Sequence, residues 1–293
     1  MELRIQNLSK TYPNGVQALK DVSLAIGSGM FGLLGPNGAG KSTLMRILAT
    51  IQEADAGSVL LGDIDVLKEK TRVRQVLGYL PQEFGVYPKV TAVDLLDHFA
   101  YLKGVTNTAE RRALVASLLK QTNLWDARHN RLGGYSGGMK QRFGIAQALI
   151  GDPRLIIVDE PTAGLDPEER VRFHNLLSEI GEQVIVILST HIVSDVSDLC
   201  QQMAIIQRGR VVLTGAPLDL ATSLRGRIWQ KMVPRSEADA YKTRLPVISS
   251  RLITGKVQVR VHGDSAPEEG FDVVEPDLED LYFWSMKHAE AAA

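Results

Sequence analysis

A chain of 293 residues in which 44% of the side chains are hydrophobic and 23% are charged has the composition of a globular protein, which excludes a disordered or fibrous one. Its formal net charge of −1 excludes the strongly basic field that attracts nucleic acid or anionic membranes. The single cysteine, Cys200, excludes an internal disulfide, favours a reducing compartment and is expected to be a small buried hydrophobe.

The chain begins with MELRIQNLSK, which lacks the apolar core of a signal peptide. We therefore expect no export by that route. No stretch approaches the roughly 18 apolar residues that a membrane-spanning helix needs. We expect the chain to be soluble by itself.

Short apolar runs alternate with helical patterns over most of the first 215 residues. The runs predict strands buried on both faces at Met30–Leu34, Leu77–Leu80, Leu155–Val158 and Val184–Leu188. Helices are predicted at residues 41–50, 91–103, 109–121, 137–150, 167–180 and 192–200, with Thr91 and Thr108 as N-caps of two of them. This alternation predicts an α/β domain over residues 1–216 with a mostly parallel sheet.

The pattern changes after about residue 216. Short strands are predicted at Ile228–Val233, Val247–Ile253, Lys256–Val261 and Phe271–Val274, with a helix near Glu237–Thr243 and a last helix from Leu278. We interpret residues 217–293 as a small α+β accessory domain.

Charge is polarised in this last part of the chain. Residues 208–260 hold eleven Lys and Arg against three Asp and Glu, and residues 264–280 hold eight Asp and Glu with no Lys or Arg. Mutual pairing or solvated faces explain this best. A nucleic-acid site is the alternative, but the segment lacks the interleaved aromatic residues that base stacking uses.

A phosphate-binding loop is predicted between the first buried strand and its helix. The motif G-x-x-x-x-G-K-[ST] is matched by Gly35-Pro36-Asn37-Gly38-Ala39-Gly40-Lys41-Ser42-Thr43. Glycines let backbone N–H groups approach phosphates, and the helix adds its positive end. We expect Lys41 to reach the β- and γ-phosphates and Ser42 to ligate Mg²⁺.

Two acids end the apolar strand Leu155–Val158. Asp159 is placed to hold Mg²⁺, and Glu160, one residue later, to polarise the attacking water. A strand that merely runs into a charged turn is the alternative, which the upstream phosphate loop and the strand-stopping Pro161 disfavour.

A second anion-binding helix start lies between these two motifs, in Tyr135-Ser136-Gly137-Gly138-Met139-Lys140-Gln141-Arg142. A plain Ser-Gly-Gly helix cap is the alternative for the tripeptide alone. The segment resembles the signature motif of ABC ATPases, usually written LSGGQ and followed by a basic residue. Tyr135 and Met139 replace the usual Leu and Gln, whereas Ser136, Gly137 and Gly138 are intact.

Further landmarks of that family follow in its order, and the resemblance covers about residues 2–216. Tyr12 resembles the aromatic residue that stacks on adenine, although a lone Tyr could equally pack. Gln82 resembles the glutamine that links the γ-phosphate and Mg²⁺ site to the membrane domain. Ala163-Gly164-Leu165-Asp166 resembles the loop along the dimer seam, and His191, after Ser189-Thr190, resembles the switch histidine.

The resemblance implies a phosphate-loop ABC ATPase fold with a helical subdomain at about residues 83–150. It implies ATP and Mg²⁺ as cofactors, with Ser42, Gln82 and Asp159 at the metal. It also implies a head-to-tail dimer, with an identical or a paralogous copy, in which each signature closes on the γ-phosphate of the opposite loop.

Two further segments resemble those of bacterial export ATPases. In the family, the membrane subunit docks near Phe84-Gly85-Val86-Tyr87-Pro88, for which a locally packed loop is the alternative. Glu275-Pro276-Asp277-Leu278-Glu279-Asp280-Leu281-Tyr282-Phe283 resembles the closing motif of drug-resistance-type export ATPases, which have a separately encoded permease.

We therefore predict a peripheral ATPase subunit at the cytoplasmic face of the cell membrane that drives a permease, with Glu160, His191, Lys41 and Gln82 in the catalytic centre. No nucleic-acid partner is expected. The alternative is an ABC ATPase that acts on DNA or ribosomes without transport. Relatives of that kind generally carry long coiled coils, zinc modules or two ATPase domains. The sequence has no heptad run, no Cys cluster and no second phosphate loop, which disfavours this alternative.

Overall fold

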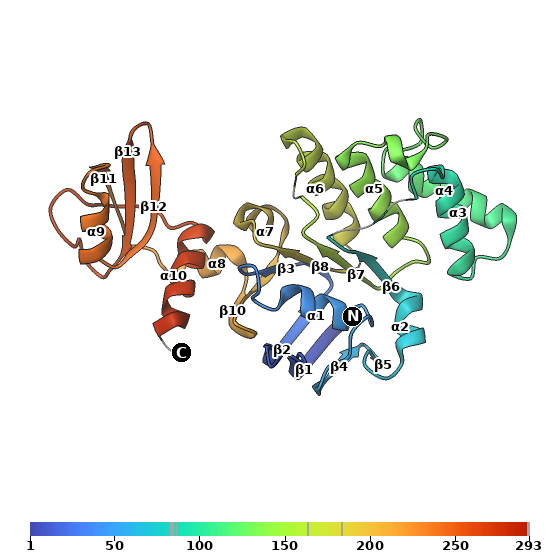
Figure 1. Ribbon diagram of the computed structural model, residues 1–293, viewed down its shortest axis with the longest axis horizontal. Helices are drawn as coiled ribbons and strands as arrows, with labels where there is room; N and C mark the ends of the chain where they lie inside the picture. Colours follow the sequence, from blue (N-terminus) through green and yellow to red (C-terminus); the bar gives the residue numbers. More distant parts are fainter. Residues whose placement is uncertain (83–84, 86, 163, 183, 292–293) are drawn as a thin grey trace.

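The computed structural model describes residues 1–291 except 83, 84, 86, 163 and 183. The described chain forms three β-sheets with helices packed around them (Figure 1). The third sheet, near the carboxyl terminus, lies at one end of the molecule, away from the other two. No helix among the described residues is both long and apolar enough to cross a bilayer.

The central sheet has the strand order β10-β9-β3-β8-β7-β6. Its strands are β3 (Gly29–Leu34), β6 (Leu77–Leu80), β7 (Leu155–Asp159), β8 (Ile185–Thr190), β9 (Gln202–Gln207) and β10 (Arg210–Gly215). All neighbours pair in parallel except β9 and β10. β3, β7 and β8 are buried along their whole length, as their continuous apolar runs predict. The four predicted strands of the parallel sheet are confirmed.

A second sheet, which is antiparallel and was not predicted from the sequence, shares a hydrophobic core with helix α1 and the central sheet. Its strand order is β2-β1-β4-β5, with β1 (Glu2–Thr11), β2 (Gln17–Gly27), β4 (Ala56–Leu61) and β5 (Ile64–Asp65). Buried and exposed positions alternate along β1 and β2, as in a sheet with one wet face. The inward side chains, such as Leu3 and Ile5, share a core with helix α1.

The helices are α1 (Lys41–Leu48), α2 (Lys70–Val76), α3 (Ala92–Leu102), α4 (Thr108–Gln121), α5 (Gly137–Ala148), α6 (Pro167–Gly181), α7 (Val193–Leu199), α8 (Pro217–Thr222), α9 (Ala238–Arg244) and α10 (Leu278–Ala291). Thr91 caps α3 as predicted, because its side chain accepts a hydrogen bond from the Asp94 N–H. The prediction of Thr108 as a cap is wrong. Asn107 caps α4 with an amide oxygen that accepts from two backbone N–H groups, and Thr108 is already helical.

Helices α3, α4 and α5 pack on one another around a core of their own, in which Phe143 is fully buried. Figure 1 shows this group beside the β6 edge of the central sheet. Cys200 is buried at the end of α7, and burial raises the pKa of its thiol to about 12. The expectation of a buried cysteine is confirmed.

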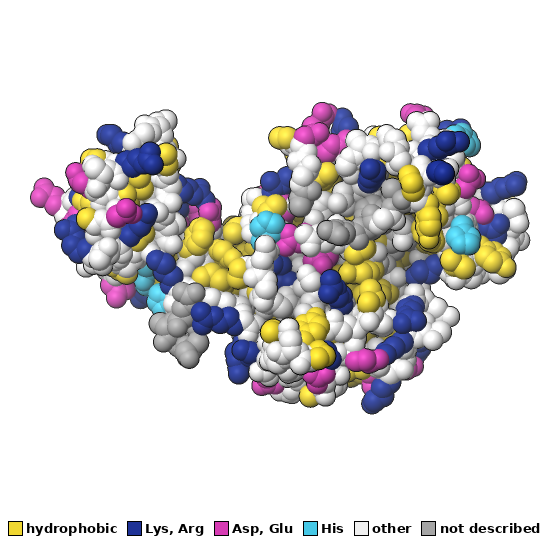
Figure 2. Space-filling model, in the orientation of Figure 1, with side chains coloured by type: hydrophobic (Ala, Val, Ile, Leu, Met, Phe, Trp, Pro, Cys, Tyr) yellow, Lys and Arg dark blue, Asp and Glu magenta, His cyan; other side chains and the backbone are white. Residues whose placement is uncertain are grey.

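The third sheet has the order β12-β13-β11-β14, formed by β11 (Ile228–Pro234), β12 (Val247–Ile253), β13 (Lys256–His262) and β14 (Asp272–Val273). Helix α9 contributes Ala238 and Tyr241 to a small core with the sheet. The predicted mutual pairing of the polarised charges is confirmed. The pairs are Arg225–Glu275, Arg227–Asp264, Lys231–Glu268, Arg244–Glu268, Arg251–Glu279 and Arg260 with Asp277 and Asp280. Figure 2 shows both signs of charge interspersed over this lobe.

Asp280 anchors helix α10 to this sheet. Asp277 and Asp280 each accept a hydrogen bond from the other's backbone N–H, at 2.8 and 3.1 Å respectively, which caps the start of α10. Arg260, on β13, donates to Asp280 Oδ2 at 2.7 Å. The other side of α10 packs against α7, α8 and the β9–β10 hairpin. The closing sequence motif therefore joins the third sheet to the central one.

Replacing Asp280 with Asn should lower the free energy of unfolding by about 2 kcal/mol, because a buried arginine contact and a helix cap are both weakened. Thermal melting followed by circular dichroism measures this change. Asp239→Asn removes an exposed ion pair with Lys242 and should cost less than about 0.5 kcal/mol. Equal melting temperatures for the two variants would contradict the anchoring role of Asp280.

Candidate functional site

The phosphate loop connects the buried strand β3 to helix α1. Gly38 and Gly40 adopt φ angles of 78° and 111°, which suit glycine far better than other residues. A Cβ atom on Gly40 would lie 2.4 Å from the Ala18 carbonyl oxygen. The loop is therefore held in its shape by the neighbouring strand β2.

A cleft of about 540 Å³ opens over this loop. Its lining includes Tyr12, Gln82, Glu160 and every loop residue from Pro36 to Thr43. The structure thus brings together residues that the sequence analysis took from four separate motifs. Gly35 lies just below, where its carbonyl accepts a hydrogen bond from Lys41 Nζ at 2.6 Å.

Lys41 lies almost fully buried at the floor of the cleft. Its Nζ is 3.6 Å from Glu160 Oε1. Burial lowers the pKa of Lys41, and the negative charges of Glu160 and Asp159 oppose that shift. The ammonium group is therefore confined at the place where a phosphate would be stabilised.

Glu160 follows strand β7 directly. Its φ angle of 52° is left-handed, a strained conformation that clusters at functional sites when the surroundings hold it. Its backbone N–H donates to the Ser189 carbonyl at 2.8 Å. The carboxylate is buried, with Oε1 toward Lys41 and Oε2 in contact with His191 Nδ1. One carboxylate thus links the phosphate loop to the end of β8.

Asp159 has the features of a cation ligand. The side chain is buried, and its Oδ1 has no hydrogen-bond partner among the described residues. Burial raises the pKa of Asp159, and the charge of Glu160 adds to that shift. A hard cation with oxygen ligands, such as Mg²⁺, would relieve this carboxylate, and Ser42 and Gln82 are the predicted neighbours that could share it.

The signature segment does not take part in this cleft. Ser136 caps α5 with an oxygen that accepts from the Met139 N–H at 3.2 Å, and neither it nor Gly137, Gly138 or Asp166 lines the cleft. Asp166 caps α6 by accepting from the Glu169 N–H at 2.8 Å.

The unusual Tyr135 has a local explanation. It is buried, and its hydroxyl donates to the Ala127 carbonyl at 2.9 Å. Burial without that bond would be costly for a hydroxyl. Met139, the other departure from the family's signature, packs at the margin of the α3–α5 core.

Several residues at the cleft were missed by the sequence analysis, notably Lys20 and Arg208. Arg208 lies in the tight turn between β9 and β10, where the Gly209 N–H donates to the Ala39 carbonyl of the phosphate loop at 2.9 Å. The Arg208-Gly209 pair between two apolar runs is the sequence pattern that could have predicted this turn. Of the other predicted segments, Phe84, Val86 and Ala163 lie outside the described residues.

Gly138 is tightly enclosed. A Cβ atom on Gly138 would lie 2.2 Å from Oε2 of Glu169 on helix α6. Glu169 forms an ion pair with the buried Arg142, which lies on α5 like Gly138. Nothing lies within 4 Å of a Cβ atom built on Gly137. A methyl group at position 138 must therefore push Glu169 away from Arg142.

Gly138→Ala should destabilise the nucleotide-free protein by about 2 kcal/mol, because Arg142 would lose its partner while buried. This corresponds to a melting temperature lower by roughly 4–8 °C. Gly137→Ala is the matched control and should melt within about 2 °C of the wild type, since the helix gains propensity and loses no space. Identical melting of both variants would rule out the close packing on Glu169.

Comparisons with known proteins agree with this geometry. The family model described as "ABC transporter" matches residues 19–163. The probable multidrug ABC transporter ATP-binding protein YbhF of Escherichia coli is 32% identical over 96% of this chain, which spans only 51% of that relative. The ABC transporter ATP-binding protein NatA of Bacillus subtilis is 38% identical over 72% of this chain and 86% of its own length.

Among solved structures, the ATP-binding cassette MJ0796, a dimer in a post-hydrolysis state with ADP and Pi, superposes with a TM-score of 0.67. It is 28% identical in sequence, and the match covers 73% of this chain and 98% of that one. With the phosphate loop, the acidic end of β7 and these relatives together, the chain belongs to the ABC transporter ATP-binding proteins.

Proposed function

We propose that this chain hydrolyses ATP as one half of a head-to-tail dimer and so drives a separately encoded membrane permease, with residues 1–216 as the ATPase domain and 217–293 as an accessory domain. The observation that carries the proposal is the position of Glu160. Its buried carboxylate lies between Lys41 of the phosphate loop and His191 at the end of β8.

ATP would lie in the cleft with its triphosphate on the backbone of Gly35–Thr43 and its base toward Tyr12. Tyr12 is already held at the loop, since its hydroxyl is 3.1 Å from Thr43 Oγ1. Ser42, Asp159 and Gln82 would hold Mg²⁺, which supplies charge neutralisation at the phosphates when bound.

Glu160 has the surroundings of a water-orienting base. It is acidic, buried and fixed by a neighbour on each side, so its carboxylate can accept a proton from a water aimed at the γ-phosphate. Lys41 is placed to stabilise negative charge on the transferred phosphoryl group. His191 can hold the carboxylate in orientation and add a donor at the same edge.

The separation of Ser136–Gly138 from the cleft supports the dimer. A helix start with two glycines is suited to bind an anion, yet this chain's own cleft is lined by other residues. In a head-to-tail pair each signature would face the opposite cleft, with Asp166 along the seam. The similar MJ0796 cassette was solved as a dimer, which supports the pairing of two copies.

A groove of about 630 Å³ beside strand β6 suits the permease. It is lined by Tyr79, Phe99, Leu102 and Lys103, and Leu102 exposes 66% of its surface. Gln82 is the second residue after the end of β6, so a segment seated in the groove would contact the strand that leads to this residue of the cleft. The resemblance of the closing motif, residues 275–283, to that of drug-resistance-type export ATPases favours an exporter at the cytoplasmic face of the membrane.

Glu160→Gln should keep ATP binding and lower kcat by roughly 100-fold or more, because the amide cannot take the proton. It should also trap an ATP-bound dimer, visible by size-exclusion chromatography with light scattering. Glu168→Gln changes an exposed side chain of α6 and should leave turnover unchanged. Wild-type turnover in Glu160→Gln would refute the assignment of the base.

Leu102→Glu should reduce the share of the chain that sediments with native membranes by at least fivefold, because a charge would enter an apolar contact. Leu218→Glu is the control, since Leu218 is 81% exposed on α8, away from the groove. Both variants should hydrolyse ATP like the wild type when purified. Equal membrane recovery of both would count against this groove as the docking surface.

A further inference from the structure

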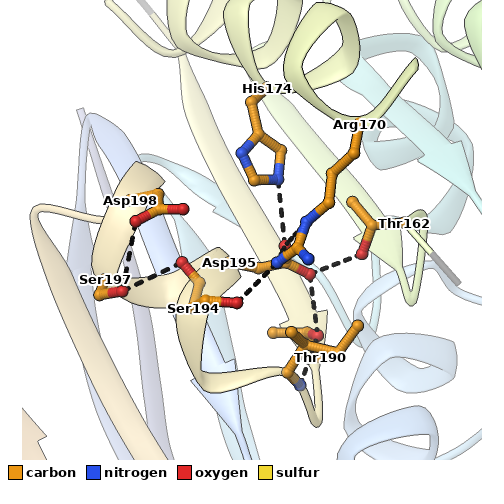
Figure 3. A network of polar contacts seen from close by, with 9 residues as sticks. Thr162, Arg170, His174, Thr190, Ser194, Asp195, Ser197 and Asp198 are labelled. Carbon is orange, nitrogen blue, oxygen red and sulfur yellow. Dashed lines mark hydrogen bonds and ion pairs between the residues drawn. The ribbon is translucent and has the colours of Figure 1, made fainter. Parts of the chain in front are cut away.

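Asp195 forms the centre of a buried polar network beside the cleft (Figure 3). The side chain is 0% exposed. Its Oδ2 accepts from Thr162 Oγ1 at 2.6 Å and from Thr190 Oγ1 at 3.4 Å. Its Oδ1 accepts from Arg170 Nη2 at 2.6 Å and lies 3.0 Å from both Arg170 Nε and His174 Nε2.

This concentration of partners fixes the carboxylate in one orientation. A buried carboxylate is costly unless charge and hydrogen bonds compensate for lost water. Burial alone would raise the pKa of Asp195, but contacts from His174, Thr162 and Arg170 outweigh it and hold that pKa below its usual range. Asp195 is therefore a charged hub with little freedom to move.

The two hydroxyls that Asp195 holds belong to residues close to the proposed catalytic side chains, one in the loop after β7 and one at the end of β8. Thr162 lies two residues after Glu160, with only Pro161 between them. Thr190 lies directly before His191, and its hydroxyl also accepts from the Ile192 N–H at 2.9 Å. The backbone on both sides of His191 is thus attached to the same carboxylate that holds the loop following Glu160.

Arg170 ties this hub to the neighbouring helix. It comes from α6, which begins at the Asp166 cap, and its Nη2 also donates to Ser194 Oγ at 2.6 Å. Figure 3 shows Arg170 and His174 reaching Asp195 from one side and Thr162 from another. Three segments therefore meet at one carboxylate: the loop after β7, the last residue of β8 and helix α6.

We propose that Asp195 is a positioning residue for ATP hydrolysis, which sets the distance between Glu160 and His191 by holding Thr162 and Thr190 on one carboxylate. The inference rests on the proposed ATPase function. Within the described part of the chain, Asp195 forms no hydrogen bond or ion pair with Glu160 or His191 and does not line the cleft, so it acts through the two threonines. ATP binding by the phosphate loop needs neither of them.

Asp195→Asn in the full chain tests this role by a split between binding and turnover. It should lower kcat at least tenfold per folded molecule while changing the KM for ATP less than twofold. Asp280→Asn is the matched control, because Asp280 is 1% exposed and also pairs with an arginine but lies away from both proposed catalytic side chains. It should reduce the melting temperature and leave kcat within twofold.

Threonine substitutions keep the test decisive if Asp195→Asn folds poorly. Thr162→Val preserves shape and removes the hydroxyl, whereas Thr162→Ser keeps it. The same pair applies to Thr190. The valine variants should lose kcat and the serine variants should retain most of it.

Normal kcat in Asp195→Asn and both valine variants, with only stability reduced, would overturn the inference. That result can be distinguished from failure of the proposed function. If the proposed function itself is wrong, the wild type shows no ATP turnover that Glu160→Gln abolishes. In that case the Asp195 and threonine variants cannot differ from the wild type in kcat.

Discussion

The parallel direction of β3, β8, β7 and β6 sends the carboxyl ends of four buried strands to one edge of the sheet. The catalytic part of the cleft follows from that alignment, whereas Tyr12 and Lys20 reach the cleft from the antiparallel sheet and Arg208 from the β9–β10 turn. The phosphate loop leaves β3, the acidic pair ends β7, His191 follows β8 and Gln82 follows β6. Residues far apart in the sequence therefore meet because of strand direction and not because of local sequence.

Burial then decides how these groups behave. Charged side chains in a dry environment must be paired or they lose their charge, and each buried charge at this edge has a defined partner or a ligand role. Lys41 contacts Glu160, Glu160 contacts His191, and Asp195 is compensated by Arg170. Asp159 Oδ1 has no hydrogen-bond partner among the residues that the structure describes, and the proposed Mg²⁺ would supply one. The site is thus preorganised before any nucleotide enters it.

The sequence was sufficient to predict the parallel core, most helices and the chemistry of the phosphate loop, because continuous apolar runs and fixed motif spacings carry that information. It was insufficient for β1 and β2, whose alternating pattern was not recognised, and for the cap of α4. Asp195 was missed for a different reason. An acid inside a polar heptapeptide such as Val193–Leu199 has no local signature, and only the fold shows that it lies between the loops of Glu160 and His191.

Co-purification would show whether this chain acts on a membrane partner. The tagged chain would be isolated from native membranes in mild detergent, and its partners identified by mass spectrometry. We expect one polytopic membrane protein in stoichiometric amount. Recovery only in the soluble fraction, together with nucleic acid or ribosomes, would contradict the transport role while leaving the ATPase geometry intact.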